Sequence, residues 1–298
     1  MANFIHSAIV MAIVIALQIR CSIQETVPES DNLLESNLVD GCDAEVFDPS
    51  KTYANHLPRF CGVTENYLTW HAALQYKGLS KDSLLFNCSG TLISERYVLT
   101  AAHCASSDVP PYEVRLGMPT IREKRNWRYF GIECIIRHQG YKEHLKRNDI
   151  ALIRLATEVK FDDYIYPVCL PATSELRPAR PEPYVIDRWG YLIDEVDPIA
   201  IFFVNRSECY DWLESKGIIL DANQFCMEER AFASDSCRTP PGAIIGYYSF
   251  ILFDPKKIHQ FPFVQMAFVS FEMGCGNVYQ VFTNVSSHMD WITANMKP

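Results

Sequence analysis

The chain has 298 residues, of which 48% are hydrophobic and 21% charged, and apolar residues occur along most of its length, which excludes a largely disordered protein. Its 27 Lys and Arg residues against 36 Asp and Glu give a net charge of −9, which argues against nucleic acid or an anionic membrane as the main partner. Its eleven cysteines include no C-x-x-C pair, so they indicate disulfides made in an oxidising compartment and argue against a zinc ribbon or a thioredoxin-type redox site.

The N-terminus predicts a secreted protein. Residues 8–17 read AIVMAIVIAL, an apolar run that is too short to cross a bilayer but typical of a signal peptide, so we assign residues 1–22 to a signal peptide. A signal anchor is the alternative. Residues 23–62 then follow as an acidic leader and a loop-rich cysteine tether that carries Cys42 and Cys61.

From Leu68 onward the chain is expected to be all-β. Short β-branched or aromatic runs alternate with turn residues, which indicates a barrel or a sandwich and not βαβ units. These runs cover residues 91–102, 112–117, 129–138, 149–156, 184–190, 263–271 and 279–285. The segment 286–296 has apolar residues at helical spacing after a serine, so it predicts a C-terminal helix.

Two stretches of this domain are basic, namely REKRNWR at 122–128 and KEHLKR at 142–147. We interpret both as solvated loops, with a polyanion site as the alternative.

Several short motifs occur in a fixed order along the chain. They are FNCSGTLIS (86–94), YVLTAAHC (97–104), RNDIALIRL (147–155), YPVCLP (166–171), DSC (235–237) and CGNVYQVFTNVSSHMDWI (275–292). In this order and spacing, the chain resembles the trypsin/chymotrypsin-type (S1) serine protease domain, and in particular the arthropod clip-type branch with its non-catalytic homologues. The resemblance covers about residues 63–298 and implies two packed six-stranded antiparallel barrels with a C-terminal helix.

The resemblance implies one half of a catalytic triad. In this family a histidine takes the proton of a serine hydroxyl, and a buried aspartate orients that histidine. The matching residues here are His103 and Asp149, and Ser270 matches the serine that supports the aspartate.

The other half of the site departs from the family pattern. After the cysteine of DSC the family has one variable residue and then Gly-Asp-Ser-Gly-Gly-Pro, whereas Cys237 is followed by Arg238, Thr239, Pro240, Pro241 and Gly242. The nucleophile position therefore falls on Pro241, which has neither a hydroxyl nor an N–H. Of the two oxyanion-hole donors, one maps to Thr239 and the other, at Pro241, is expected to be lost.

Two other interpretations of this segment stay open. A shifted register would make Ser236 the nucleophile, and an error in the sequence would hide an intact site. The activation apparatus supports a real loss. Active members are cut after Arg or Lys and pair the new N-terminal ammonium with the aspartate before the nucleophile, but that position is Pro240 and residues 61–74 hold no Arg or Lys.

The specificity pocket is also expected to be altered. Asp235 occupies the position that gives trypsin-like members their preference for Arg or Lys. The two glycines of the pocket walls match Glu272 and Gln280, whose side chains are expected to fill the slot and, with Arg238, to give its mouth a polar rim.

The resemblance also implies disulfide pairs, and the chain carries glycosylation sequons. The implied pairs are Cys88–Cys104, Cys209–Cys226, Cys237–Cys275 and Cys61–Cys169, and Cys42 and Cys134 are left over as a possible fifth pair. N-x-[ST] sequons occur at Asn87, Asn205 and Asn284, of which we expect Asn205 and Asn284 to be modified.

The sequence as a whole predicts a secreted, catalytically inactive serine protease homologue without metal or cofactor. Family analogy predicts that it binds other extracellular proteins as a cofactor or regulator of protease cascades in innate immunity and melanisation. The alternatives are an active trypsin-like endopeptidase and a module that recognises microbial surfaces.

Overall fold

The computed structural model describes residues 61, 69–77, 88–117, 124–171, 184–186, 199–203, 206–229, 241–248, 262–272 and 279–297. The chain divides into one unit of residues 1–38 and one of residues 39–298, and all described residues belong to the second. The predicted signal peptide lies outside the described residues, as does the leader except for Cys61, so both remain predictions. No described helix combines the length and the apolar character that crossing a bilayer requires.

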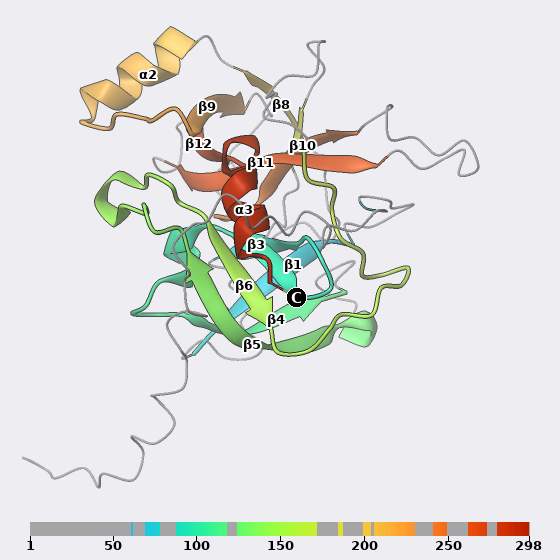
Figure 1. The fold of residues 1–298 in the computed structure, drawn as a ribbon. Coiled ribbons are helices and arrows are strands. Elements are labelled where there is room, and N and C mark those ends of the chain that lie inside the picture. Colours follow the sequence, from blue (N-terminus) through green and yellow to red (C-terminus); the bar gives the residue numbers. More distant parts are fainter. Residues whose placement is uncertain are drawn as a thin grey trace, which may run out of the picture. The chain divides into compact units, whose positions relative to one another are not determined.

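The first half of the domain is a closed antiparallel barrel of six strands in the order β1-β2-β3-β6-β5-β4 (Figure 1). Its strands are β1 (His71–Tyr76), β2 (Ser89–Leu92), β3 (Tyr97–Thr100), β4 (Pro111–Leu116), β5 (Arg128–Arg137) and β6 (Ala151–Leu155). Leu and Ile side chains from these strands fill its interior, and several, such as Leu92, Leu116 and Leu152, are fully buried. Burial of each such side chain stabilises the fold by about 1.5–3 kcal/mol.

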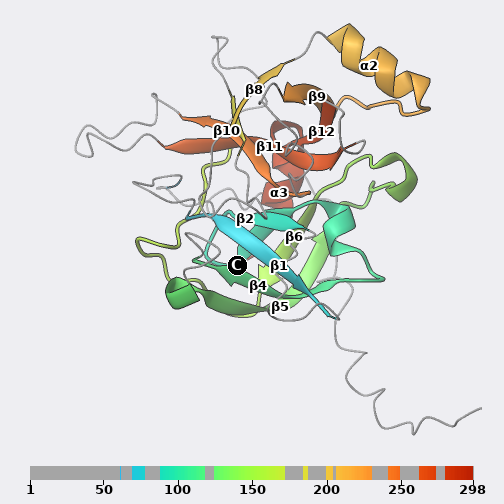
Figure 2. The same ribbon diagram turned by 180° about the vertical axis from the view of Figure 1, so that it is seen from behind.

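The second half is another closed antiparallel barrel, in the order β10-β11-β12-β9-β8-β7 (Figure 2). Its strands are β7 (Tyr184–Ile186), β8 (Ile199–Phe203), β9 (Gln224–Glu229), β10 (Ile244–Tyr248), β11 (Phe263–Glu272) and β12 (Tyr279–Asn284). The prediction of two six-stranded antiparallel barrels is therefore confirmed.

The described residues also form one helix of ten residues and five shorter helical elements. The helix α2 (Arg206–Ser215) precedes β9, and the short 3-10 turns are η2 (Ala102–Ala105), η3 (Lys124–Asn126), η4 (Glu143–Leu145) and η6 (Ser286–His288). The C-terminal helix α3 (Met289–Asn295) is confirmed, although the turn after the predicted serine start is 3-10 and not α-helical.

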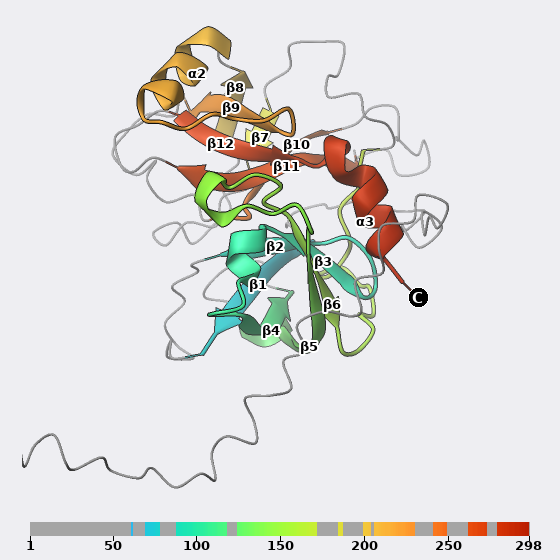
Figure 3. The ribbon, with the colours of Figure 1, turned by 60° about the vertical axis from the view of Figure 1, so that its left-hand side comes forward.

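Helix α3 contacts the first barrel (Figure 3). Trp291 and Ile292 belong to the same buried cluster as the first barrel's core, and the indole N–H of Trp291 donates to Gln139 Oε1 at 3.0 Å. Just beyond α3, the backbone of Lys297 forms hydrogen bonds with the Tyr97 hydroxyl of β3 at 2.9 and 3.0 Å. The end of the chain, which follows the last strand of the second barrel, is thereby attached to the first.

The two barrels share apolar contacts. The Trp70 ring before β1 stacks on Phe263 of β11 with 5.2 Å between ring centroids, and both side chains are buried. Ile244 and Phe268 of the second barrel also belong to the first barrel's core cluster. The relative position of the strands that carry the site is therefore fixed by packing as well as by hydrogen bonds.

Three histidines are held in their neutral form by this packing. Burial lowers the pKa of His71 in β1 to about 3. Burial, together with the repulsion that a protonated His288 would exert, lowers the pKa of His138 to about 4, and burial also lowers the pKa of His288. In the unfolded chain these side chains bind protons below about pH 6.5.

We therefore predict that the free energy of unfolding falls when the pH is lowered from 7 to 5, because the unfolded state then binds more protons than the native state. His71 alone is expected to account for about 2 kcal/mol of the loss at pH 5. Urea titrations at the two pH values measure the effect. His71→Gln should reduce the difference by that amount, whereas replacement of the exposed His144 by Gln should not. Equal stability of the wild type at both pH values would contradict the prediction.

Candidate functional site

A fully buried carboxylate, Asp149, is the centre of the site. It precedes β6, and its side chain is 0% exposed. Asp149 Oδ1 accepts the backbone N–H of His103 at 2.9 Å, and Oδ2 lies 2.8 Å from His103 Nδ1. The hydroxyl of Ser270 donates to the same Oδ2, and the hydroxyl of Thr283 donates to the backbone carbonyl of Asp149 at 3.2 Å. A buried carboxylate must be hydrogen-bonded, because it has lost its hydration, and groups of His103 and Ser270 contact both of its oxygens.

Ser270 reaches Asp149 because of an irregularity in the second barrel. The register between β11 and β12 shifts between Val269 and Phe271, so Ser270 is the extra residue of a bulge. Bulges redirect a side chain and are frequent beside active sites. The three residues that the sequence assigned to the half-triad, His103, Asp149 and Ser270, are thus brought together across the two barrels.

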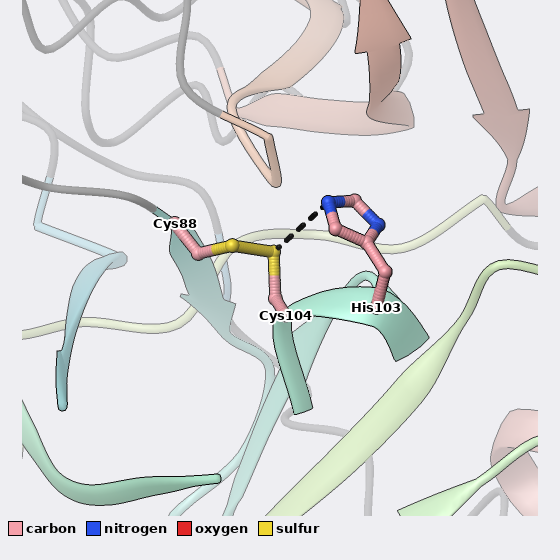
Figure 4. Close-up of side chains that lie close together, drawn as sticks. All are labelled: Cys88, His103 and Cys104. Carbon is pink, nitrogen blue, oxygen red and sulfur yellow. Dashed lines mark hydrogen bonds between the residues drawn. A yellow bond between two sulfur atoms is a disulfide. The ribbon is translucent and has the colours of Figure 1, made fainter. Parts of the chain in front are cut away.

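The ring of His103 is fixed at one nitrogen and faces a disulfide with the other. Nδ1 is directed at Asp149, and Nε2 lies 3.6 Å from the Sγ of Cys104, which is bonded to Cys88 (Figure 4). The His103 side chain is 18% exposed. The two sulfurs and one ring nitrogen of His103 lie within 4.8 Å of one another, but the sulfurs are joined in a disulfide and are not thiolate ligands for a metal.

Pro241 lies beside this disulfide. Its carbonyl accepts the backbone N–H of Ser89, the residue after Cys88, at 2.9 Å. The next residue, Gly242, has φ +85°, and a Cβ there would lie 1.9 Å from the Ser89 carbonyl oxygen, so only glycine fits. The N–H of Gly242 donates to the carbonyl of Val269 at 2.8 Å. The Pro241–Gly242 turn is therefore bound between β2 and β11, next to Ser270.

The two residues predicted to form the pocket walls are paired in neighbouring strands. Glu272 and Gln280 are direct partners in the β11–β12 register, and Gln280 is 3% exposed. A long polar side chain is thus buried at one of the two positions that the sequence resemblance matches to a glycine of the family, a match that remains a prediction.

Three implied disulfides are present among the described residues, namely Cys61–Cys169, Cys88–Cys104 and Cys209–Cys226. Cys134 is also disulfide-bonded. Its partner is not one of these six cysteines. The proposed partner Cys42 lies outside the described residues, so that pair remains a prediction.

The structure contradicts the prediction of glycosylation at Asn284. This residue ends β12 and is 2% exposed, and its Oδ1 accepts the N–H of Ser286 at 3.0 Å. A glycan on this nitrogen would have no path to solvent. A sequon records only a local tripeptide and not its burial, which is why the sequence misled.

Several predicted residues lie outside the described residues and remain predictions. They are Asn87, Asn205, Asp235, Ser236, Cys237, Arg238, Thr239, Pro240 and Cys275. Conversely, sequence reasoning missed the roles of Ser89 and Thr283. Both residues lie within the quoted motifs. The sequence shows that each has a hydroxyl and a backbone N–H, but it does not show which atoms these groups bond in the folded chain.

Comparison with known proteins identifies the family. A family model described as Trypsin matches residues 62–239, which is more than half of the chain, and the chain belongs to this family of trypsin-type serine protease domains.

Insect clip-type proteins are among the similar sequences and structures. The chain is 31% identical over 251 residues to phenoloxidase-activating factor 3 of Holotrichia diomphalia, covering 76% of this chain and 69% of that protein. It is 28% identical over 253 residues to CLIP domain-containing serine protease B9 of Anopheles gambiae, covering 76% of this chain but only 60% of the mosquito protein. The crystal structure of the Drosophila Grass clip serine protease of the Toll pathway matches with a TM-score of 0.60 at 25% identity, covering 85% of this chain and 76% of that one. The resemblance to the clip-type branch is confirmed.

The hydroxyl of Ser270 yields a stability prediction. Ser270→Ala should lower the free energy of unfolding by about 1.5–3 kcal/mol, because a buried carboxylate loses a donor. Ser287→Ala is the matched control, since the Ser287 hydroxyl bonds the Asn284 carbonyl at 2.9 Å but its side chain is exposed. The control should change stability by less than about 0.5 kcal/mol. Urea titration measures both, and equal losses would refute a special role for Ser270.

Proposed function

We propose that the protein is a secreted, catalytically inactive serine protease homologue that acts by binding, as a cofactor or regulator of an extracellular protease cascade. The observation that carries the proposal is the proline at the nucleophile position. Pro241 has no nucleophilic atom to attack a carbonyl and no N–H to stabilise an oxyanion. Loss of a single oxyanion donor reduces turnover by about 10²–10³, and loss of the nucleophile adds to that.

The arrangement around Pro241 supports this assignment of the nucleophile position. The Pro241–Gly242 turn lies against Ser89, beside the disulfide that His103 Nε2 faces. On this assignment, the hydroxyl oxygen from which a triad histidine would take a proton is missing, although His103 and Asp149 keep their mutual hydrogen bond. The family match also ends at residue 239, two residues before Pro241.

The activation chemistry points the same way. An active family member needs a carboxylate before its nucleophile to pair with a new N-terminal ammonium, and Pro240 cannot supply one. Either group alone would be an uncompensated buried charge. A chain that does not undergo zymogen activation needs neither the Arg or Lys at the cleavage site nor the carboxylate before the nucleophile, and this chain lacks both at the matching positions.

The cascade role rests on the relatives. One relative is named a phenoloxidase-activating factor, and another is described as a protease of the Toll pathway. The predicted signal peptide and the disulfides support an extracellular site of action.

The first test is for catalysis. The purified full chain should hydrolyse no Arg or Lys ester or amide, and a fluorophosphonate probe should leave it unlabelled, because Pro241 cannot form the adduct. A related active trypsin-type protease is the positive control. Stoichiometric labelling at Ser236, located by mass spectrometry, would instead support the alternative of an active endopeptidase.

The second test asks whether the remaining half-triad does chemistry. In a reconstituted phenoloxidase-activating cascade, His103→Ala should support activation as well as the wild type, because binding needs no proton transfer. His144→Ala, at an exposed position, is the matched control. If His103→Ala abolished support while its thermal stability stayed at the wild-type value, a chemical role of His103 would replace the binding role.

A further inference from the structure

The loop between β5 and β6 is held in a strained shape close to the site. Lys146 and Asn148 both have φ 49°, and among the described residues they are the only non-glycine residues with positive φ. Asn adopts this conformation fairly readily, but lysine at such a position costs about 1–2 kcal/mol. Strain of this kind persists only where the surroundings enforce it, and it is concentrated at functional sites.

Contacts with the second barrel enforce the shape. The Gln224 side chain donates to the Lys146 carbonyl at 2.9 Å, and the Asn223 side chain donates to Asn148 Oδ1 at 3.3 Å. Within the loop, Lys142 and Arg147 form a backbone bridge. These hydrogen bonds hold the loop backbone in one conformation, so its outward side chains keep fixed positions relative to one another.

The side chains that this loop presents are mainly cationic and unpaired. Lys142, Lys146 and Arg147 form no ion pair with any described residue. The Nε of Arg147 is buried and has no hydrogen-bond partner, which is unusual for a guanidinium nitrogen. The loop has one carboxylate of its own, the exposed Glu143, since Asp149 is committed to His103 and Ser270.

Exposed apolar side chains accompany these cations. Leu145 is 46% exposed in the loop, and Ile219 is 61% exposed in the segment after α2. The Gln224 amide connects the two segments, since it donates to Lys146 and accepts the N–H of Asp221 at 3.3 Å. The Asp221 carboxylate is itself used locally, by the N–H of Asn223 at 2.8 Å.

We propose that Lys142, Leu145, Lys146, Arg147 and Ile219 form a docking surface for an acidic segment of a partner protein that carries an apolar side chain. Carboxylates of the partner pair with the three cations, and its apolar side chain covers Leu145 and Ile219. The proposal rests on the proposed function and names the chemistry of its partner. A sulfated polysaccharide would satisfy the cations but would leave two exposed apolar side chains uncovered, so the apolar component favours a protein.

The test uses a fluorescent acetylated peptide, Asp-Glu-Phe-Glu-Asp-Leu-Glu-Asp, and the full chain in an anisotropy titration. We expect the peptide to bind and its affinity to fall between about 50 and 300 mM salt, because the contacts are partly ionic and exposed. The double variant Lys142→Glu/Lys146→Glu should bind it at least about tenfold more weakly. Leu145→Ser/Ile219→Ser should also weaken binding about tenfold, and a peptide with Ser in place of Phe and Leu should behave in the same way.

Matched variants control for net charge and for apolar surface elsewhere. Lys77→Glu/Lys160→Glu makes the same charge change at exposed lysines outside the loop, and Val109→Ser removes a side chain that is 57% exposed. Both should bind the peptide within about twofold of the wild type. Urea titration of every variant ensures that a loss of binding is not a loss of fold.

The outcomes separate this surface from the proposed function. Peptide binding that is absent, or unchanged by Lys142→Glu/Lys146→Glu, would overturn the surface even if the protein still supports the cascade without hydrolysis. Binding of a heparin fragment that needs the lysines but not Leu145 and Ile219, with no binding of the peptide, would replace the protein partner by a polyanion. Fluorophosphonate labelling would overturn the proposed function and leave the surface standing.

Discussion

The buried carboxylate of Asp149 is the constraint on which the architecture around the site depends. A charge with no exposure must be surrounded by donors, and here they come from η2, from the β11 bulge and, for its carbonyl, from β12. These elements belong to both barrels. The need for them is the same whether or not a substrate is cleaved, since it follows from burial alone. A chain can therefore lose its nucleophile and still retain the geometry of a half-triad, and retained geometry is not by itself a sign of catalysis.

The same reasoning explains how the fold tolerates a proline at residue 241, the position that we propose as the family's nucleophile position. The fold uses the carbonyl of Pro241, which accepts the Ser89 N–H, and it uses the flexibility of Gly242 at φ +85°. It makes no use of a hydroxyl or an N–H at residue 241. Catalysis requires a hydroxyl and an N–H at this position, whereas the turn requires the carbonyl of residue 241 and the glycine at residue 242. On the proposed assignment, proline at this position would remove the chemistry and leave the path of the backbone between β2 and β11 in place.

Sequence motifs predicted the barrels and the half-triad because those features depend on local residue types in a fixed order. They did not single out β1, in which His71 and Gln75 are buried together with apolar neighbours, so that no polar–apolar alternation marks the strand. They misjudged Asn284, whose sequon is buried by strand pairing. They also gave no indication that Lys146 has a positive φ, since a lysine favours no such conformation and the hydrogen bond from Gln224 of β9 to its carbonyl is a tertiary contact. What the sequence lacked in each case was information on tertiary contacts.

Net charge is the remaining point at which the sequence misleads. Of the 36 acidic residues, eight lie in residues 21–50, where there is no Lys or Arg, whereas residues 51–298 hold 26 basic and 28 acidic residues. The net charge of −9 is therefore mostly a property of the segment before the barrels. Beyond about 10 Å, exposed charges are largely screened at physiological salt, so a partner that approaches the β5–β6 loop meets the local cations and not the charge of the whole chain. An acidic partner is then compatible with an acidic protein, provided that it docks where Lys142, Lys146 and Arg147 outnumber the one loop carboxylate, Glu143.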